Sequence, residues 1–388
     1  MVAFIFRRSA QLLALAFCAL LVCLGPSALH AEMLITAVCP QDAVQAVSTP
    51  LSPGGIIITA FDASAIWAYD VARGARYPLE GTIPCGANCR LSPDGAWLVY
   101  YDVYQATYNR MRLDGSDRSI LVRGASELRW WADDTFVVWT PSGSVYLMPV
   151  AGGDTIPLPV SNAIDVQPGG RWVLTVTGSG ESFVRRLVYA TGAEEAAPPP
   201  MLLGRDRPYF AAAAWSPDGQ TLAYVSTGPR DPDTGFFGGE LYALNMVDGA
   251  VTQWTDLTAA YGASRIGGHA PGSLYWSPDG TQLAFWVTEM TGRDPVATTA
   301  SAVLHVLDVQ SGVIHQYCGV TTAGHTPNPP RLAWSPDGTH LAFAAVPTGQ
   351  TQALLLALDV RAGTFTVLSS GVPPIYGRPD VIGWGIRP

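Results

Sequence analysis

One pentapeptide recurs three times in this chain and strongly limits what the chain can fold into. Trp-Ser-Pro-Asp-Gly stands at Trp215–Gly219, Trp276–Gly280 and Trp334–Gly338. Proline presets φ for the second position of a turn, Ser and Asp bond back to the local backbone, and Gly accepts the positive φ that closes the turn. An apolar run follows each copy, as in Thr221–Val225. Each copy therefore predicts the corner of a β-hairpin.

Weaker copies extend the series to seven corners. The third position of the corner falls at residues 53, 93, 133, 168, 217, 278 and 336, and the copy at 133 is one residue short. Each unit also supplies two further strand-like runs, such as Glu240–Asn245 and Val251–Trp254. A period near 40 residues with four strands per repeat is typical of a β-propeller.

The repeats resemble the WD-like propeller repeat of the TolB type, in which the pentapeptide is followed by xxLAF or xxLAY. The matching runs here are Leu222–Tyr224, Leu283–Phe285 and Leu341–Phe343. The resemblance implies an all-β fold, a seven-bladed β-propeller with four-stranded antiparallel blades; six or eight blades are the alternatives. The stretch before Leu51 is too short for the α/β domain that precedes the propeller in TolB itself, so the resemblance does not extend to the role of TolB in envelope complexes.

The two ends of the repeat region predict how the ring closes. Val381–Gly385 reads as one more incoming strand that ends in Trp, but no partner strand follows it. The first unit begins at Leu51 with no such strand before it. We expect Val381–Gly385 to pair into the sheet that holds Ile56–Thr59, because this pairing removes two open edges at once.

The first 31 residues have the pattern of an export signal. Arg7 and Arg8 precede an apolar run, Leu12–Leu24, and small residues lead to a cleavage site after Ala31. We therefore expect a signal peptide at 1–31, an N-terminal extension at 32–50 and the β-propeller at 51–388. The mature protein is expected to be secreted or periplasmic, in the cell envelope, with no membrane span.

Four cysteines follow the signal: Cys39, Cys85, Cys89 and Cys318. An even number of cysteines in an oxidising compartment predicts disulfides, and four thiols allow three pairings. Cys85 and Cys89 are close enough to bridge around a short turn, and we expect this bond. A metal site is the weaker interpretation, because a CxxxC pair with no second pair or nearby His lacks a full ligand set.

The long connections all fall on one face of the predicted ring. If the strands of a blade are A to D, the corners join A to B, and the A–B and C–D turns lie on one face. The long B–C connections (228–239, 289–299) and D–A connections (196–207, 257–272, 319–330) lie on the other. Long loops on a rigid scaffold are where propellers bind ligands. The candidate ligand-binding residues are Arg230, Asp231, Asp233, Phe236, Phe237, Tyr261, Arg265, Arg293 and Asp294.

Two possible metal sites lack part of their ligand set. Asp231 and Asp233 could ligate calcium, but the rest of a calcium loop is absent and a solvated turn explains them. His305 and His315 are expected on neighbouring strands with both side chains on one side of the sheet. A zinc site there would need a third ligand, which the sequence does not supply.

Composition and motifs narrow the function. The net charge of −9 argues against a nucleic-acid partner. The sequence contains no GxSxG, HExxH, P-loop or Rossmann motif. We expect a monomeric, exported TolB-like propeller without cofactor or metal, acting as a non-enzymatic binding or scaffold module for a protein or glycan partner. The alternative is a metal-dependent polysaccharide lyase or hydrolase built on a propeller; fold analogy alone carries both.

Overall fold

In a computed structural model of the chain, the repeated corners are tight turns held by their own side chains. In the corner at Trp215–Gly219, the Ser216 hydroxyl donates to Asp218 Oδ1 (2.5 Å), and the Thr221 amide donates to Ser216 Oγ (2.9 Å). Gly219 has φ +69°, the left-handed region that glycine adopts without strain. The same Ser-to-Asp bond recurs in the corners of Ser92, Ser277 and Ser335. The predicted hairpin corners are confirmed.

The structure describes residues 34–40, 43–46, 51–59, 65–82, 89–160, 162–179, 182–190, 201–206, 212–230, 232, 235, 237–267, 273–289, 301–322, 329–347, 349–372 and 380–388. The chain divides into two units, 1–34 and 35–388, and all that follows concerns the second. Among the described residues, no helix is long and apolar enough to cross a membrane.

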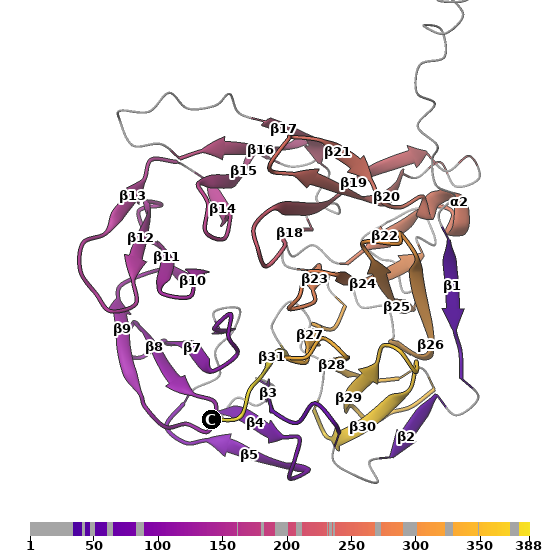
Figure 1. Ribbon diagram of the computed structural model, residues 1–388, viewed down its shortest axis with the longest axis horizontal. Helices are drawn as coiled ribbons and strands as arrows, with labels where there is room; N and C mark the ends of the chain where they lie inside the picture. Colours follow the sequence, from indigo (N-terminus) through magenta and orange to yellow (C-terminus); the bar gives the residue numbers. More distant parts are fainter. Residues whose placement is uncertain are drawn as a thin grey trace, which may run out of the picture. The chain divides into compact units, whose positions relative to one another are not determined.

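Seven small sheets follow one another around a ring (Figure 1). From the innermost strand outward, the first four blades have four strands each. Blade 1 has β31 (Val381–Gly385), β3 (Ile56–Thr59), β4 (Ile66–Asp70) and β5 (Ala75–Leu79); blade 2 has β6 (Arg90–Leu91), β7 (Trp97–Asp102), β8 (Thr107–Arg112) and β9 (Ser119–Arg123); blade 3 has β10 (Glu127–Ala132), β11 (Thr135–Trp139), β12 (Val145–Pro149) and β13 (Ile156–Leu158); blade 4 has β14 (Ala163–Val166), β15 (Trp172–Ser179), β16 (Ser182–Tyr189) and β17 (Met201–Asp206).

The last three blades carry the three full pentapeptides. Blade 5 has β18 (Ala213–Trp215), β19 (Thr221–Arg230), β20 (Phe237–Asn245) and β21 (Val251–Gln253); blade 6 has β22 (Ser264–Ile266) and β23 (Tyr275–Trp276), both paired with β24 (Gln282–Glu289), then β25 (Ala302–Asp308) and β26 (Ile314–Thr322); blade 7 has β27 (Ala333–Trp334), β28 (His340–Ala345), β29 (Leu354–Asp359) and β30 (Phe365–Ser370). The seven-bladed β-propeller expected from the sequence is confirmed.

The C-terminal strand closes the ring as predicted. β31 pairs antiparallel with β3, with Ile56 opposite Gly385 and Ile58 opposite Gly383. Glycine is needed at 385, because a Cβ there would lie 2.2 Å from the Gly95 carbonyl oxygen of blade 2. The closing strand therefore completes blade 1 and also packs its backbone directly on blade 2.

The apolar core lies between neighbouring blades. The Trp215 side chain packs in one cluster with Leu174 and Leu187 of blade 4. The Trp334 indole N–H of blade 7 donates to the Tyr275 carbonyl of blade 6 (2.8 Å). The repeated Trp residues thus join successive blades, which is the packing role expected for side chains at the same place in each unit.

The N-terminal extension adds an outer strand to two blades, so that blade 6 has six strands and blade 7 has five. β1 (Ile35–Val38) pairs in parallel with β26, and β2 (Val44–Ala46) pairs in parallel with β30. A disulfide joins Cys39, just after β1, to Cys318 in β26. These two strands run along the outer edges of blades 6 and 7 (Figure 1). Blades 6 and 7 therefore depart from the four-stranded expectation.

Strand B varies in length, and the variation is on one side of the ring. In blades 2, 4, 5, 6 and 7 strand B begins at the same place after its corner, four residues beyond the third corner position. It has 6 residues in blades 2 and 7, 8 in blades 4 and 6, and 10 in blade 5. Since the starts coincide, the additional residues all extend the B–C end of blades 4 to 6, which we call the raised rim.

Candidate functional site

The candidate ligand-binding residues of the B–C connections fall at and beyond the ends of strands. Arg230 is the last residue of β19 and pairs with Phe237, the half-buried first residue of β20. The connection predicted at 228–239 is therefore largely hairpin. The long D–A connection predicted at 196–207 is wrong, because Met201–Asp206 forms β17, the D strand of blade 4. The long connection there is 190–200, which joins strands C and D on the corner face. Asp231, Asp233, Phe236, Arg293 and Asp294 lie outside the described residues.

Tyr261 and Arg265, expected on a long D–A loop, lie in regular structure instead. Tyr261 ends a short helix, α2 (Leu257–Tyr261), and Arg265 is a buried residue of β22, with 3% of its surface exposed. The helix is held by Glu240 of β20, whose buried carboxylate accepts hydrogen bonds from the amides of Leu257 (2.7 Å) and Thr258 (2.8 Å). The ligand-binding roles of Tyr261 and Arg265 remain predictions.

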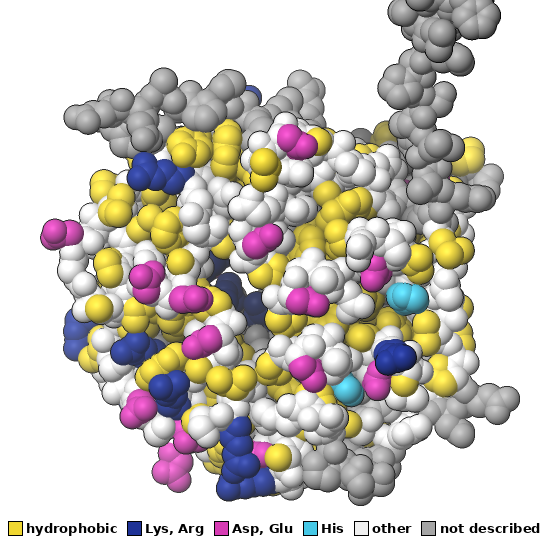
Figure 2. All heavy atoms as spheres, viewed as in Figure 1, with side chains coloured by type: hydrophobic (Ala, Val, Ile, Leu, Met, Phe, Trp, Pro, Cys, Tyr) yellow, Lys and Arg dark blue, Asp and Glu magenta, His cyan; other side chains and the backbone are white. Residues whose placement is uncertain are grey.

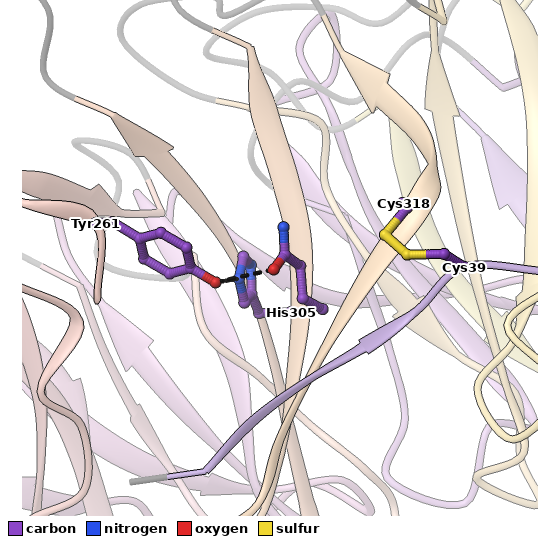
Figure 3. Close-up of a disulfide and its surroundings, with 5 residues drawn as sticks. Cys39, Tyr261, His305 and Cys318 are labelled. Carbon is purple, nitrogen blue, oxygen red and sulfur yellow. Dashed lines mark hydrogen bonds between the residues drawn. A yellow bond between two sulfur atoms is a disulfide. The ribbon is translucent and has the colours of Figure 1, made fainter.

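The Tyr261 side chain points toward His305 of blade 6 (Figure 3). Its hydroxyl lies 3.1 Å from His305 Nε2 and 3.0 Å from Gln316 Oε1. His305 Nδ1 lies 3.0 Å from the Val303 carbonyl, which can only accept, so Nδ1 carries the proton. Burial lowers the pKa of His305 to about 4, so this imidazole is neutral at physiological pH.

The expected juxtaposition of His305 and His315 is wrong. In the observed register His305 lies opposite Gln316, and His315 lies opposite Val306. Directly paired residues share a face of a sheet and successive residues alternate, so the two imidazoles are on opposite faces. In the described part of the chain, no group of three His, Cys, Asp or Glu could hold a metal ion.

The structure resolves part of the disulfide pairing that the sequence left open. Cys39 is bonded to Cys318, which selects one of the three possible pairings for these two. Cys89 is also disulfide-bonded. Cys85, its expected partner, lies outside the described residues, so the Cys85–Cys89 bond stays a prediction.

A small pocket lies where the innermost strands and corners of four blades converge. Its volume is about 220 Å³. Figure 2 shows the ring hollowed at its centre, with basic side chains inside the opening and acidic ones around it. The pocket is lined by residues of blades 1, 2, 6 and 7: Leu91–Gly95, Pro278, Ala333, Trp334, Pro336 and Ile382–Trp384.

The pocket wall offers few free polar groups. The Ser92 hydroxyl donates to Asp94 and accepts from the Trp97 amide (2.9 Å). Asp94 accepts in turn from the Ala96 amide (3.0 Å). The Trp334 and Trp384 indole N–H groups donate to the carbonyls of Tyr275 and Gly54. The hydroxyl and indole groups of the wall are thus already engaged within the protein, and the Asp94 carboxylate is exposed.

Charged side chains lie in or just before the innermost strands of five successive blades. We call them the charged arc: Arg331 of blade 7, Asp380 of blade 1, Arg90 of blade 2, Glu127 and Arg129 of blade 3, and Asp165 of blade 4. Arg129 bridges two acids, Glu127 (2.6 Å) and Asp165 (3.0 Å). Arg90 lies 3.5 Å from Glu127. About a quarter of each of these four side chains is exposed, and on innermost strands this exposed area faces the channel.

In the rest of the charged arc, Asp380 of blade 1 is bonded to backbone amides and not to a guanidinium group. Asp380 is 1% exposed, and its Oδ1 accepts from the backbone amides of Arg331 (3.2 Å) and Val381 (2.9 Å). Its Oδ2 is buried and has no hydrogen-bond partner within the part of the chain that the structure describes. Burial raises the pKa of Asp380 to about 7, although the two amides and Arg331 oppose this shift. Burial, with Arg331 and Arg129 nearby, lowers the pKa of Arg90 to about 9.

Sequence reasoning did not single out the charged arc. The signal was present: Arg90, Glu127, Arg129 and Asp165 each stand a few residues before a corner, in strands that are otherwise apolar. These positions differ in residue type from blade to blade, so the repeat pattern itself did not mark them. Their proximity follows only from the closed ring.

Comparison with known proteins identifies the fold. No protein-family model matches the chain, and no curated protein matches it. Among solved structures, a mutant of puromycin hydrolase complexed with PGG is 16% identical, with a TM-score of 0.52. The match covers 88% of this chain and 58% of that one, so the chain spans less than two thirds of the enzyme.

Other structural neighbours are also propellers. TolB from Acinetobacter baumannii is 13% identical with a TM-score of 0.42, over 85% of this chain and 82% of TolB. The tricorn protease is 11% identical with a TM-score of 0.46, over 79% of this chain and 34% of that one. TolB proteins are thus among the neighbours of a chain whose repeats resemble the TolB type, and at these identities the likeness concerns the fold.

Proposed function

We propose that this protein is an exported β-propeller that binds a protein or glycan partner at the raised rim and has no enzymatic activity of its own. The binding surface is the B–C and D–A face of blades 4 to 6, where Arg230 and Phe237 lie. The rest of the ring holds this surface rigidly.

The observation that carries the proposal is the one-sided lengthening of strand B. In blades 2, 4, 5, 6 and 7 strand B starts at the same distance from its corner, whereas β15, β19 and β24 extend at their B–C ends. Exposed turns on either face tolerate insertion, so drift would lengthen both faces. Strand B gains length at this end in three adjacent blades, whereas on the corner face one C–D connection, 190–200 of blade 4, is the long exception. This contrast supports a used face at the B–C ends.

Export is supported by two independent features. The N-terminal residues have the basic, apolar and small-residue order of a signal peptide. Cys39 and Cys318 form a disulfide, a bond that persists in oxidising compartments. Partners in the cell envelope or outside the cell are therefore the ones to test.

Shortening the blade 5 hairpin tests the site. Residues 229–237 are replaced by Asn-Gly, which links Gly228 to Gly238 through a two-residue turn and keeps Glu240 with its hold on α2. The matched control is Val247→Ser, an exposed side chain on the C–D turn of the same blade. Binding is measured on arrays of envelope glycans and by affinity capture from envelope extracts.

We expect the shortened variant to keep its melting temperature within a few degrees and to lose at least tenfold in affinity for whatever the wild type captures. Val247→Ser should bind like wild type. Unchanged binding by the shortened variant together with lost binding by the control would assign the partner to the opposite face. Turnover of a captured glycan would contradict the non-enzymatic part of the proposal.

A further inference from the structure

The N-terminal segment that holds β1 and β2, which we call the strap, is attached to the outer edges of blades 6 and 7 with little burial. β1 pairs with β26 through four residues, and β2 pairs with β30 through three. None of the strap residues whose side chains the structure describes is buried: Thr36, Ala37, Cys39, Val44 and Gln45 are exposed, and Ile35, Val38, Pro40 and Ala43 are half-buried. The strands beneath are fully packed, since Tyr317 and Phe365 are 0% exposed. The strap is therefore an addition to sheets that already have a core.

Two glycines of the ring fix where the strap lies. A Cβ at Gly363, in the C–D turn of blade 7, would lie 2.3 Å from Val38 Cγ1, and one at Gly319 of β26 would lie 2.4 Å from Ala43 Cβ. The Phe365 amide of blade 7 donates to the Ala43 carbonyl (2.6 Å). Val38 pairs with blade 6 and lies against blade 7, whereas Ala43 bonds to blade 7 and lies against blade 6. The strap thus has one defined position across the seam between the two blades.

The disulfide that ties the strap to blade 6 is open to solvent. Cys39 and Cys318 are both exposed, and Figure 3 shows the bond joining the chain after β1 to β26. A disulfide is cleaved when a thiolate attacks one of its sulfurs, so access to the sulfurs is a condition for the reaction. A dithiol can therefore reach this bond without any opening of the ring.

We infer that the Cys39–Cys318 disulfide is a redox latch: a dithiol reductant cleaves it in the folded protein, and the strap then leaves blades 6 and 7 while the seven-bladed ring stays closed. One thiolate of the dithiol displaces the first cysteine and forms a mixed disulfide with the second, and the other thiolate then displaces the second cysteine. Two electrons and two protons pass to Cys39 and Cys318, and the dithiol becomes a disulfide. The latch makes no use of the raised rim.

Once the disulfide is reduced, few contacts hold the strap in place. Ordering the backbone costs conformational entropy at every residue, and exposed side chains offset none of this cost by burial. Parallel pairing is also slightly less stable per residue than antiparallel pairing. In the oxidised protein the disulfide lowers the entropy cost, because it confines a detached strap to the neighbourhood of β26. In the reduced protein the contacts of Val38 and Ala43 have to offset the ordering of the whole strap.

The ring does not use the strap for its closure. β31 pairs with β3 in blade 1, and strands A to D of blades 6 and 7 pair among themselves. Release of the strap therefore removes one outer strand from each of these two blades and leaves an open edge on β26 and on β30. The Phe365 amide, which is bonded to Ala43 while the latch is closed, then exchanges with solvent and reports the release.

Hydrogen–deuterium exchange of the wild-type protein at pH 7, with and without dithiothreitol, tests the latch. Thiol alkylation and mass analysis of the same samples establish that Cys39 and Cys318 are reduced. We expect reduction to raise the exchange rate about tenfold or more in peptides that cover Ile35–Val38, Val44–Ala46 and Phe365–Val367. Peptides that cover β3 and β31 should be unchanged, and reoxidation should restore the protection of the strap.

The matched control is Cys39→Ser/Cys318→Ser, which keeps the disulfide of Cys89. Its strap peptides should exchange fast without reductant, and any change that dithiothreitol still causes in this variant comes from the Cys89 bond. Should the variant not fold, the wild-type comparison decides alone. Wild-type strap peptides that stay protected after complete reduction would overturn the inference, because strand pairing would then suffice to hold the strap. Reduction that occurs only in denaturant, or exchange that rises equally in every blade, would also overturn it.

Discussion

At the scale of single residues, Glu240 shows how a buried charge fixes a connection. It is fully buried and accepts four hydrogen bonds at 2.6 to 2.8 Å, from the Thr255 hydroxyl, the Leu257 amide, and the amide and hydroxyl of Thr258. These bonds join β20 to the first turn of α2. A carboxylate with this many donors stabilises the D–A connection between blades 5 and 6.

Glu240→Gln should lower the free energy of unfolding by about 2 kcal/mol, because the new NH₂ group faces donors and leaves buried N–H groups unsatisfied. The matched control is Asp134→Asn, an exposed acid bonded to the Thr135 hydroxyl, which should change stability by less than about 0.5 kcal/mol. Urea denaturation of the three proteins measures both values. A Glu240→Gln protein as stable as wild type would show that this anchor is dispensable.

His305 gives a prediction of how the stability of the fold depends on pH. Burial lowers its folded-state pKa to about 4 from 6.5, so the unfolded chain binds the proton more readily. The contribution of neutral His305 to the free energy of unfolding is complete above pH 6.5 and is lost as pH falls toward 4. Over the full window this contribution amounts to roughly 3 kcal/mol.

The measurement is the free energy of unfolding at steps from pH 7 to pH 4.5 for wild type and His305→Gln. Gln can keep hydrogen bonds to Tyr261 without a charge to desolvate. The wild-type curve should fall more steeply than that of the variant. If the two curves of unfolding free energy against pH were parallel, His305 would not be the group that determines the loss of stability between pH 7 and pH 4.5.

At the scale of elements, the repeat pattern predicted the corners and strands that recur from blade to blade. Features that depend on single residues were missed. The corners and the closing strand follow from a pattern that recurs seven times. The extension of β19 to Arg230 was hidden, because Gly228 and Pro229 normally indicate a loop. Gly228 is needed in the strand because a Cβ there would meet Glu240 at 2.6 Å, and Pro229 sits at a register shift between Thr227 and Arg230, where a strand accepts it.

The long D–A connection was misread for a related reason. β22 pairs with β24 at its far end, with Arg265 opposite Thr288, so the innermost strand of blade 6 is interrupted. β22 has three residues and is separated in sequence from β23, so it shows no alternation of apolar and polar residues from which a strand could be predicted. The charged arc was missed because it combines single residues of five blades, and only ring closure brings them together.

The strap formed by β1 and β2 should stabilise blades 6 and 7 through its disulfide. The Cys39–Cys318 bond closes a loop with a sequence separation of 279 residues. Replacing both cysteines with Ser should lower the free energy of unfolding by about 2–5 kcal/mol. The ring itself should persist, since β31 still pairs with β3.

Thermal denaturation with and without a reductant checks this expectation. Wild type should lose stability on reduction, and the double Ser variant should respond only through any remaining disulfide. Mapping of unreduced peptides from the same samples tests the Cys85–Cys89 bond. Identical melting temperatures for wild type and variant would show that strand pairing alone holds the strap.

At the scale of the whole molecule, the two faces of the ring differ in form. The corner face carries tight turns around most of the ring, with one long C–D connection, 190–200, in blade 4. The B–C face rises only over blades 4 to 6, so a partner bound there meets three adjacent hairpins held at fixed spacing by inter-blade Trp packing. A rigid scaffold that presents projecting hairpins binds without large conformational change.

Hydrogen–deuterium exchange with and without the captured partner tests this division most directly. The account predicts protection on binding in peptides that cover the B–C ends of the raised rim, at Ser179–Ser182, Arg230–Phe237 and Glu289–Ala302. The corners at Ser92–Gly95 and Gln310–Gly312 should exchange as in the free protein. Protection confined to those corners, with the raised rim unchanged, would contradict the assigned binding face.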